Sequence, residues 1–185
     1  MKDVLKQNAG LTFDNRGLRI GVFVVAYDAD SMITETLGRV PEDVWSAIDV
    51  LFVIDDCSRD QTVERALAFG RHREKIVVLR NRVSQQYGGN LKNGFQYAID
   101  RGLDAVVLLH ADGKFAPECL GSMLGPIVRD EADVVIGSRM KVRGAALEAG
   151  MPRYKYWGNR ALSRIQSALG GVRLSEFHSG YRAFR

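Results

Sequence analysis

The chain has 185 residues, 46% of them hydrophobic and 26% charged, which suits one globular domain with a sizeable core. Its formal net charge is +4, but the basic residues are scattered until the stretch from Arg139 to Arg164, which argues against a nucleic-acid partner. The two cysteines, Cys57 and Cys119, lack the spacing of a zinc site or a disulfide framework, so a reducing, cytoplasmic environment is expected.

The longest apolar runs, at residues 22–26 and 105–109, are too short to cross a bilayer, and the polar N-terminus lacks the apolar core of a signal peptide. We therefore expect a soluble chain that touches a membrane at most peripherally, at its inner face. Residues 1–18 are interpreted as an N-terminal extension and residues 19–185 as one domain. Because the sequence stops just after a strand-like segment, a longer protein cut at its C-terminus is expected.

Apolar runs rich in β-branched residues alternate with helical patterns along the chain. In order we expect a strand at 20–26, a helix from Asp30 or Ser31 to 39, a strand at 50–54, a helix at 62–69, a strand at 75–79, a glycine-rich turn at 88–94 that enters a helix at 95–101, a strand at 105–109, a helix at 117–124 and a strand at 133–136. This rhythm predicts an α/β fold with a mostly parallel central sheet, helices on both faces and right-handed crossovers.

Residues 154–169 have apolar side chains at helical spacing beside Lys155, Arg160 and Arg164, which predicts a basic amphipathic helix. Packing of this helix on the sheet is the favoured interpretation. Contact of the same helix with an anionic membrane surface is the alternative.

Polar residues follow three of the expected strands at the point where each strand ends. They are Tyr27, Asp28 and Asp30 after the first strand, Asp55, Asp56 and Asp60 after the second, and His110, Ala111 and Asp112 after the fourth. In an open parallel sheet, ligands bind outside the carboxyl ends of the strands. Grouped carboxylates repel one another unless cations or hydrogen-bond donors neutralise them, so a divalent metal and a polar ligand are natural partners. Asp30 and Asp60 could instead cap helices.

Taken in order, several segments resemble the family 2 glycosyltransferases, in the branch that includes dolichyl-phosphate mannose synthases. Residues 24–28 resemble the family's VVPxYN turn, with Ala26 for proline and Asp28 for asparagine, and residues 53–62 match its VDDxSxDxT segment. Residues 90–102 resemble its NxGxxxAxxxG loop with shifted glycines. Residues 137–139 and 176–182 resemble its GSR and (D)xxSGFR segments. The resemblance implies the GT-A fold and makes residues 19–185 the catalytic domain.

Residues 110–118 resemble the family's metal motif, DADxQxxPE, with two departures. His110 stands where the first aspartate is usual, and Lys114 stands where a glutamine is often found. A histidine can still ligate Mn²⁺ or Mg²⁺, whereas a protonated lysine cannot and would contact a phosphate instead.

The resemblance implies an inverting transfer of a sugar from a UDP- or GDP-sugar to a polyprenyl phosphate or a saccharide, assisted by a divalent metal. It implies donor contacts from Ala26, Tyr27, Asp28, Asp55, Asp56, Ser58, Asn90, Lys92 and Ala111, metal ligation by Asp112 and His110, and catalytic roles for Asp112, Arg139, Glu176, His178 and Arg182. A saccharide acceptor would need a base, for which Glu176 or His178 is available. The alternative hypothesis is a regulatory module that binds the nucleotide sugar without turnover.

Overall fold

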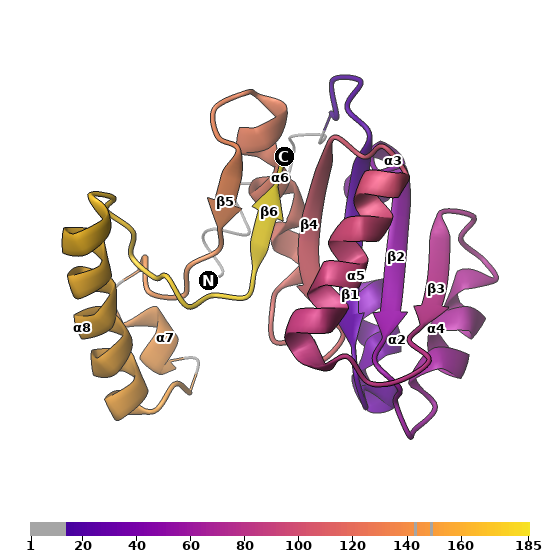
Figure 1. Ribbon diagram of the computed structural model, residues 1–185, viewed down its shortest axis with the longest axis horizontal. Coiled ribbons are helices and arrows are strands. Elements are labelled where there is room, and N and C mark those ends of the chain that lie inside the picture. The colour runs from indigo at the N-terminus through magenta and orange to yellow at the C-terminus, as the bar shows by residue number, and fades with distance from the viewer. Residues whose placement is uncertain (1–13, 143, 149) are drawn as a thin grey trace.

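A single mixed sheet organises the computed structural model, which describes residues 14–142, 144–148 and 150–185 (Figure 1). Within these residues the strand order is β3-β2-β1-β4-β6-β5. The strands are β1 (Ile20–Ala26), β2 (Val50–Asp55), β3 (Ile76–Arg80), β4 (Ala105–His110), β5 (Val134–Ile136) and β6 (Arg182–Phe184). The first four are parallel, and β6 runs antiparallel between β4 and β5. The predicted α/β fold with a mostly parallel sheet is confirmed.

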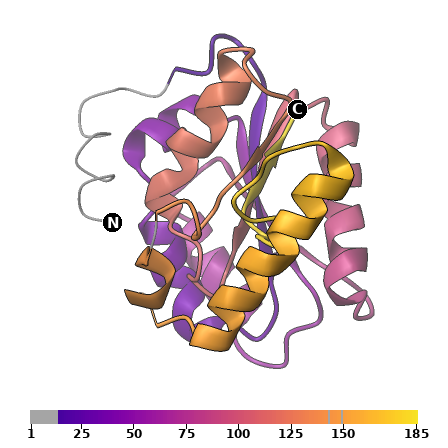
Figure 2. The same ribbon diagram turned by 90° about the vertical axis from the view of Figure 1, so that its left-hand side faces the viewer.

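Helices cover both faces of the sheet, as expected. They are α2 (Asp30–Gly38), α3 (Glu42–Ala47), α4 (Thr62–Gly70), α5 (Gln86–Asp100), α6 (Leu120–Val128), α7 (Ala145–Glu148) and α8 (Arg153–Gly170), with a 3-10 turn at Pro117–Cys119. Side chains of α2, α3, α4 and α6 build the larger core on one face, and α5 builds the smaller core on the other. Figure 2 shows α5 and α6 on opposite sides of the sheet. The short helix α3, which starts directly after Pro41, was not expected.

The glycine-rich segment is helical, so its prediction as a turn is wrong. Helix α5 begins at Gln86 and contains Gly88, Gly89 and Gly94. Gly94 lies over Phe23 of β1, and a Cβ atom at this position would collide with the Phe23 ring. The ring of Phe23 in turn stacks on Phe52 of β2, with centroids 5.0 Å apart. Gly94 therefore allows α5 to pack closely on the sheet. Residue propensities alone indicate a turn for such glycines, which explains the wrong prediction.

Helix α8 does not pack on the sheet, so the favoured interpretation of this segment is also wrong. Figure 1 shows α8 beyond β5, at the far side of the molecule from β3. Tyr156 joins a small cluster with Met140 and Ala146, and the side chain of Trp157 is 61% exposed. Most apolar side chains of α8 are exposed, so too few are buried to hold the helix against the sheet. Among the described residues, no helix combines the length and the apolar character needed to cross a bilayer.

We expect the substitution Gly94→Ala to lower the free energy of unfolding by about 1–3 kcal/mol, because the added methyl overpacks the contact with Phe23. Gly88→Ala is the matched control in the same helix, since nothing lies within 4 Å of its added Cβ. This control should stabilise the protein by about 0.5–1 kcal/mol through the higher helix propensity of alanine. Urea unfolding followed by circular dichroism measures both. Equal effects of the two substitutions would contradict the packing role of Gly94.

Candidate functional site

The carboxyl ends of β1, β2 and β4 meet at one edge of the sheet. The Asp56 N–H donates to the Ala26 carbonyl at 2.9 Å, and the Ala111 N–H donates to the Val25 carbonyl at 3.0 Å. Asp56 and Ala111 therefore flank the last residues of β1 from opposite sides. The strand spacing puts them roughly 10 Å apart.

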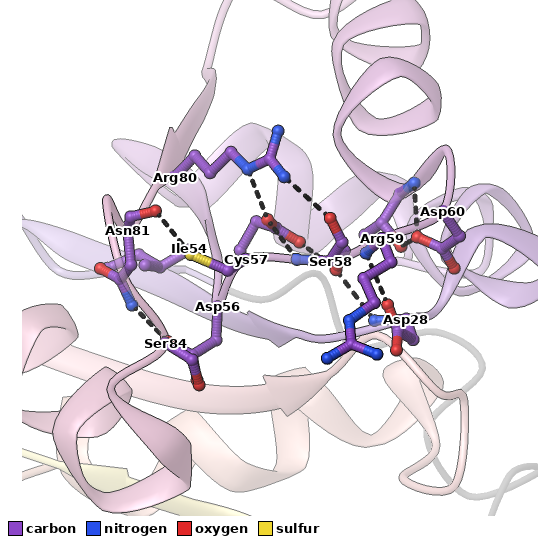
Figure 3. A network of polar contacts seen from close by, with 12 residues as sticks. Asp28, Ile54, Asp56, Cys57, Ser58, Arg59, Asp60, Arg80, Asn81 and Ser84 are labelled. Atoms are coloured by element: carbon purple, nitrogen blue, oxygen red, sulfur yellow. Dashed lines mark hydrogen bonds and ion pairs between the residues drawn. The ribbon is translucent and has the colours of Figure 1, made fainter.

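Figure 3 shows the loop after β2, with Ser58 beside Arg80 and Asp28. Asp55 and Ser58 hold this loop together. Asp55 is fully buried, accepts the Ser58 N–H at 3.0 Å and the Ser58 hydroxyl, and pairs with the Arg80 Nε at 3.4 Å. The Ser58 Oγ also accepts the Asp28 N–H at 2.9 Å. Both side chains thus hold the loop after β2 in place, and their predicted contact with the donor stays a prediction.

Asp56 is the carboxylate that anchors the start of α5. It is 5% exposed and accepts hydrogen bonds from Asn81 Nδ2 at 2.8 Å, from the Ser84 hydroxyl at 2.9 Å and from the Gln85 N–H at 2.7 Å. Burial favours the neutral acid, but these hydrogen bonds outweigh burial and lower the pKa of Asp56. Donors from Asn81, Ser84 and Gln85 thus use most of the hydrogen-bonding capacity of this carboxylate.

The other acids of this edge also accept backbone donors. Asp28, at a φ of 42°, is exposed and accepts the Arg59 N–H at 2.8 Å. Asp60 accepts the N–H groups of Asp30 and Thr62, each at 3.0 Å, and so joins the first turns of α2 and α4. The capping interpretation thus fits Asp60. Asp30 lies inside the first turn of α2 and makes no side-chain cap, so that interpretation is wrong for it.

His110 is enclosed by aromatic rings. Its Nε2 lies 3.3 Å from the Tyr87 hydroxyl, and its ring packs edge-on against Phe115 with centroids 4.8 Å apart. A Cβ atom on Gly180 would come within 3.3 Å of both the His110 Nε2 and the Tyr87 hydroxyl. Burial lowers the pKa of His110, although the charge of Asp112 acts in the opposite direction. The imidazole is therefore neutral at pH 7.

Asp112 is held by Lys114. Its Oδ1 accepts the Lys114 N–H at 3.1 Å, and its Oδ2 pairs with the Lys114 ammonium at 2.7 Å. Burial alone would raise the pKa of Asp112, but the hydrogen bonds from Lys114 lower it. Gly113 between them has a φ of +65°, a conformation that glycine adopts without strain and that lets the chain fold back over the carboxylate.

The residues at this position fit a divalent cation poorly. Hard divalent cations prefer several oxygen ligands. Of the two expected ligands, Asp112 offers a carboxylate and His110 does not. His110 and Asp112 already have partners in Tyr87 and Lys114. In the described part of the chain, no three His, Cys, Asp or Glu side chains are grouped so that they could hold a metal ion.

Arg139, after β5, is fixed by the buried Glu176. The two Glu176 oxygens accept the Arg139 N–H at 2.9 Å and its Nη2 at 3.1 Å, and the arginine side chain remains 49% exposed. Glu176 therefore positions Arg139 and is not free to act as a base. Arg182 donates to the carbonyls of Phe177 and Ser179 and braces this segment, and His178 is exposed.

The remaining expected donor contacts divide by exposure. Tyr27 is 52% exposed at the end of β1, and Lys92 is exposed on α5. Asn90 is fully buried; its amide donates to the Ile54 carbonyl at 3.0 Å and accepts from Asn81. Ala26 and Ala111 are also buried. These last three positions lie at strand and helix ends, where their donor contacts stay a prediction.

Two features of the site were not found from the sequence. Tyr87, which reaches His110, lies directly before the expected turn at 88–94 and belongs to the first turn of α5. A pocket beside α8 is lined by Met140, Lys141, Arg160, Ser163, Arg164, Leu174 and Ser175. Three of these residues are cations, and the buried Ser163 hydroxyl has no hydrogen-bond partner. The sequence indicated the basic helix but not the loops that complete this pocket.

Comparison with known proteins identifies the class. The family model described as glycosyl transferase family 2 matches residues 21–185. An undecaprenyl-phosphate mannosyltransferase from Micrococcus luteus is 31% identical over 169 residues, which are 91% of this chain and 67% of that protein. A UDP-N-acetylglucosamine–dolichyl-phosphate N-acetylglucosaminyltransferase from Methanococcus voltae is 27% identical over 177 residues, which are 89% of this chain and 68% of that protein.

The solved structures agree on the fold. Glucosyl-3-phosphoglycerate synthase from Mycobacterium tuberculosis, solved with Mn²⁺, UDP and phosphoglyceric acid, matches with a TM-score of 0.64 at 19% identity. The match covers 91% of this chain, which spans 56% of the length of that structure's chain. The protein therefore belongs to glycosyl transferase family 2, a family of enzymes. Within the family it is similar to members named for polyprenyl-phosphate acceptors.

We expect Asp56→Asn to lower the free energy of unfolding at pH 7 by about 1–3 kcal/mol, because an amide nitrogen would face hydrogen-bond donors. The folded-state pKa of Asp56 is depressed, so its stabilisation is present above the unfolded value of about 3.9 and is lost as pH falls through the folded value. The difference between wild type and variant should therefore shrink below about pH 4.

Urea unfolding at several pH values measures this difference. Asp133→Asn, at an exposed position, is the matched control and should change stability by less than about 0.5 kcal/mol. A difference between wild type and Asp56→Asn that stays constant down to acid pH would contradict the role of the ionised carboxylate.

Proposed function

We propose that this chain binds a UDP- or GDP-sugar at the carboxyl edge of the sheet and transfers the sugar to a polyprenyl phosphate, with inversion at the anomeric carbon. The observation that carries the proposal is the meeting of the β1, β2 and β4 ends, where Asp56 and Ala111 flank the last residues of β1. Ligand sites of open parallel sheets lie at such an edge. The names of the two relatives, which both specify polyprenyl-phosphate acceptors, support the same class of acceptor.

The donor half of the reaction rests on Tyr27, Asp56 and Arg139. The exposed Tyr27 ring offers a surface for the base, and the Asp56 carboxylate fixes the segment that enters α5 at the same edge. The acceptor oxygen attacks the anomeric carbon while the bond to the diphosphate breaks, and its electron pair stays on the leaving diphosphate. Arg139, held by Glu176, would offset the charge that develops there.

The acceptor half rests on the pocket beside α8. Its Lys141, Arg160 and Arg164 have no carboxylate partner among the described ion pairs, and the buried Ser163 hydroxyl is unpartnered. These groups suit the phosphate of a polyprenyl phosphate better than a neutral saccharide. A phosphate oxygen is already anionic, so the attack needs no general base. This chemistry agrees with Glu176, whose carboxylate is occupied by Arg139.

The residues present support the Mn²⁺ or Mg²⁺ ion that the resemblance implies less well than they support the nucleotide sugar. Such an ion would be held by Asp112 and His110 and would neutralise diphosphate charge when bound. In this chain Lys114 and Tyr87 already contact those two groups. No step of the proposed transfer is assigned to a metal ion.

We expect the purified chain to move label from a radiolabelled UDP- or GDP-sugar into the organic phase when undecaprenyl or dolichyl phosphate is supplied in detergent. Arg139→Ala should reduce kcat by about 10²–10³, since it removes a cation aimed at developing charge. Arg129→Ala, which removes an exposed arginine that pairs with Glu131 at the opposite edge of the sheet, is the control and should keep the wild-type rate. The anomeric configuration of the product, read by NMR, checks inversion.

The alternative is a module that binds the nucleotide sugar without turnover. The His110 and Lys114 departures from the family pattern favour it. Thermal stabilisation by a nucleotide sugar, with no release of nucleoside diphosphate under any acceptor, would support the module and contradict the transferase.

We further propose that α8 touches the inner face of a membrane, which would place the chain at the cytoplasmic side of its lipid-linked acceptor. Its exposed side chains include Tyr154, Ile165 and Leu169, at 74%, 56% and 84% exposure. Lys155 and Arg164 lie on the same helix. An unpartnered apolar face beside cations is the pattern of a helix that lies in an anionic interface.

Vesicle co-sedimentation tests this contact. The chain should pellet with vesicles rich in phosphatidylglycerol and not with pure phosphatidylcholine. Replacing Lys155, Arg160 and Arg164 together by glutamine should weaken binding at least about tenfold, since each cation near the surface contributes about 1 kcal/mol. A triple glutamine variant at the exposed Arg65, Arg71 and Arg101 has the same net charge and should bind like wild type. Equal loss in both variants would contradict a specific role of α8.

A further inference from the structure

The loop after β4 folds a cation onto the one carboxylate that the metal motif retains. Lys114 reaches both oxygens of Asp112, with its N–H 3.1 Å from Oδ1 and its ammonium 2.7 Å from Oδ2. The Lys114 side chain is 74% exposed, so its ammonium is open to solvent and to a ligand. An ammonium has three hydrogens, and one bond to Asp112 leaves two for other oxygens.

His110, the second expected metal ligand, also has a partner within the fold. The Nε2 of His110 faces the Tyr87 hydroxyl at 3.3 Å, and the His110 ring lies between the rings of Tyr87 and Phe115. A divalent ion at Asp112 would therefore meet a partnered imidazole on one side and the Lys114 ammonium on the other. The ammonium and the ion would repel each other, because both are cations that need the same carboxylate.

Both departures from the DADxQxxPE pattern make this position less negative. His110 stands in place of an aspartate, which removes a carboxylate, and Lys114 stands in place of a glutamine, which adds an ammonium. A diphosphate approaching this position meets the positive charge that it requires.

We propose that Lys114 replaces the divalent cation: its ammonium bridges Asp112 and the diphosphate of the donor, so nucleotide binding needs no metal ion. This inference rests on the proposed function, since it assumes that a nucleoside diphosphate binds at this edge. In this role Asp112 is a positioning residue, which keeps the ammonium over the diphosphate, and Gly113 permits the turn that brings the two side chains together.

Isothermal titration calorimetry with UDP and with GDP tests the proposal on the full chain. For the nucleotide that binds, the Kd of wild type should agree within about threefold in EDTA and in MnCl₂. Lys114→Gln should weaken binding at least about tenfold in EDTA, because the amide supplies no charge. Arg71→Gln, which removes an exposed cation at the other end of α4, is the control and should bind like wild type.

The double variant His110→Asp/Lys114→Gln restores the usual pattern and gives a readout in the opposite direction. We expect weak binding in EDTA and at least about tenfold tighter binding in MnCl₂, with an unchanged circular dichroism spectrum. More than threefold tightening of wild type by Mn²⁺, or Lys114→Gln binding like wild type, would overturn the replacement of the metal and leave the proposed function standing. Absence of binding by both nucleotides to wild type would overturn both proposals.

Discussion

The buried carboxylate of Asp56 determines where α5 begins, and much of the carboxyl edge follows from that point. Three donors from the segment after β3 converge on it, and one of them is the Gln85 N–H, immediately before the first turn of α5. Leaving a buried carboxylate without these donors would be costly, so the segment has little freedom. With the helix start fixed, Tyr87 in its first turn lies against His110 of β4. A single satisfied charge therefore links β2, α5 and β4 across the edge.

The acids that gather at the strand ends do not form an open acidic cluster. Asp28 and Asp60 accept backbone N–H groups, Asp112 is bound by Lys114, and Glu176 is bound by Arg139. Each carboxylate is satisfied within the fold, so the side chains that remain available to a ligand are mostly cations and hydroxyls. This balance explains why a count of acidic residues along the sequence overstates the negative charge that is free at this edge.

The strands could be predicted from the sequence because runs such as residues 20–26 and 50–54 are apolar on both faces, and such runs have few alternatives to a central parallel strand. The helical conformation of residues 88–94 could not be predicted from the sequence. Gly94 is needed for its close contact with Phe23, and this contact exists only in the folded sheet. The position of α8 could not be predicted either, since its periodicity is the same whether the apolar face meets a sheet or remains exposed. The candidate site residues at the strand ends were proposed from the order of the motifs along the sequence. The pairing of Lys114 with Asp112 could not be predicted in this way, because it depends on a turn at Gly113.

The cation expected to face the donor and the pocket expected to hold the acceptor are supported by the same two loops. Ser175 donates to Ser138 at 2.7 Å, and the next residues along each loop, the buried Glu176 and the half-exposed Arg139, form an ion pair. Ser175 also lines the pocket with Arg160 and Arg164. Removing Arg139 would leave the Glu176 carboxylate buried and unpaired, which is strongly unfavourable, so the two loops are expected to stay together. A ligand in this pocket would therefore lie beside the loop that carries Arg139.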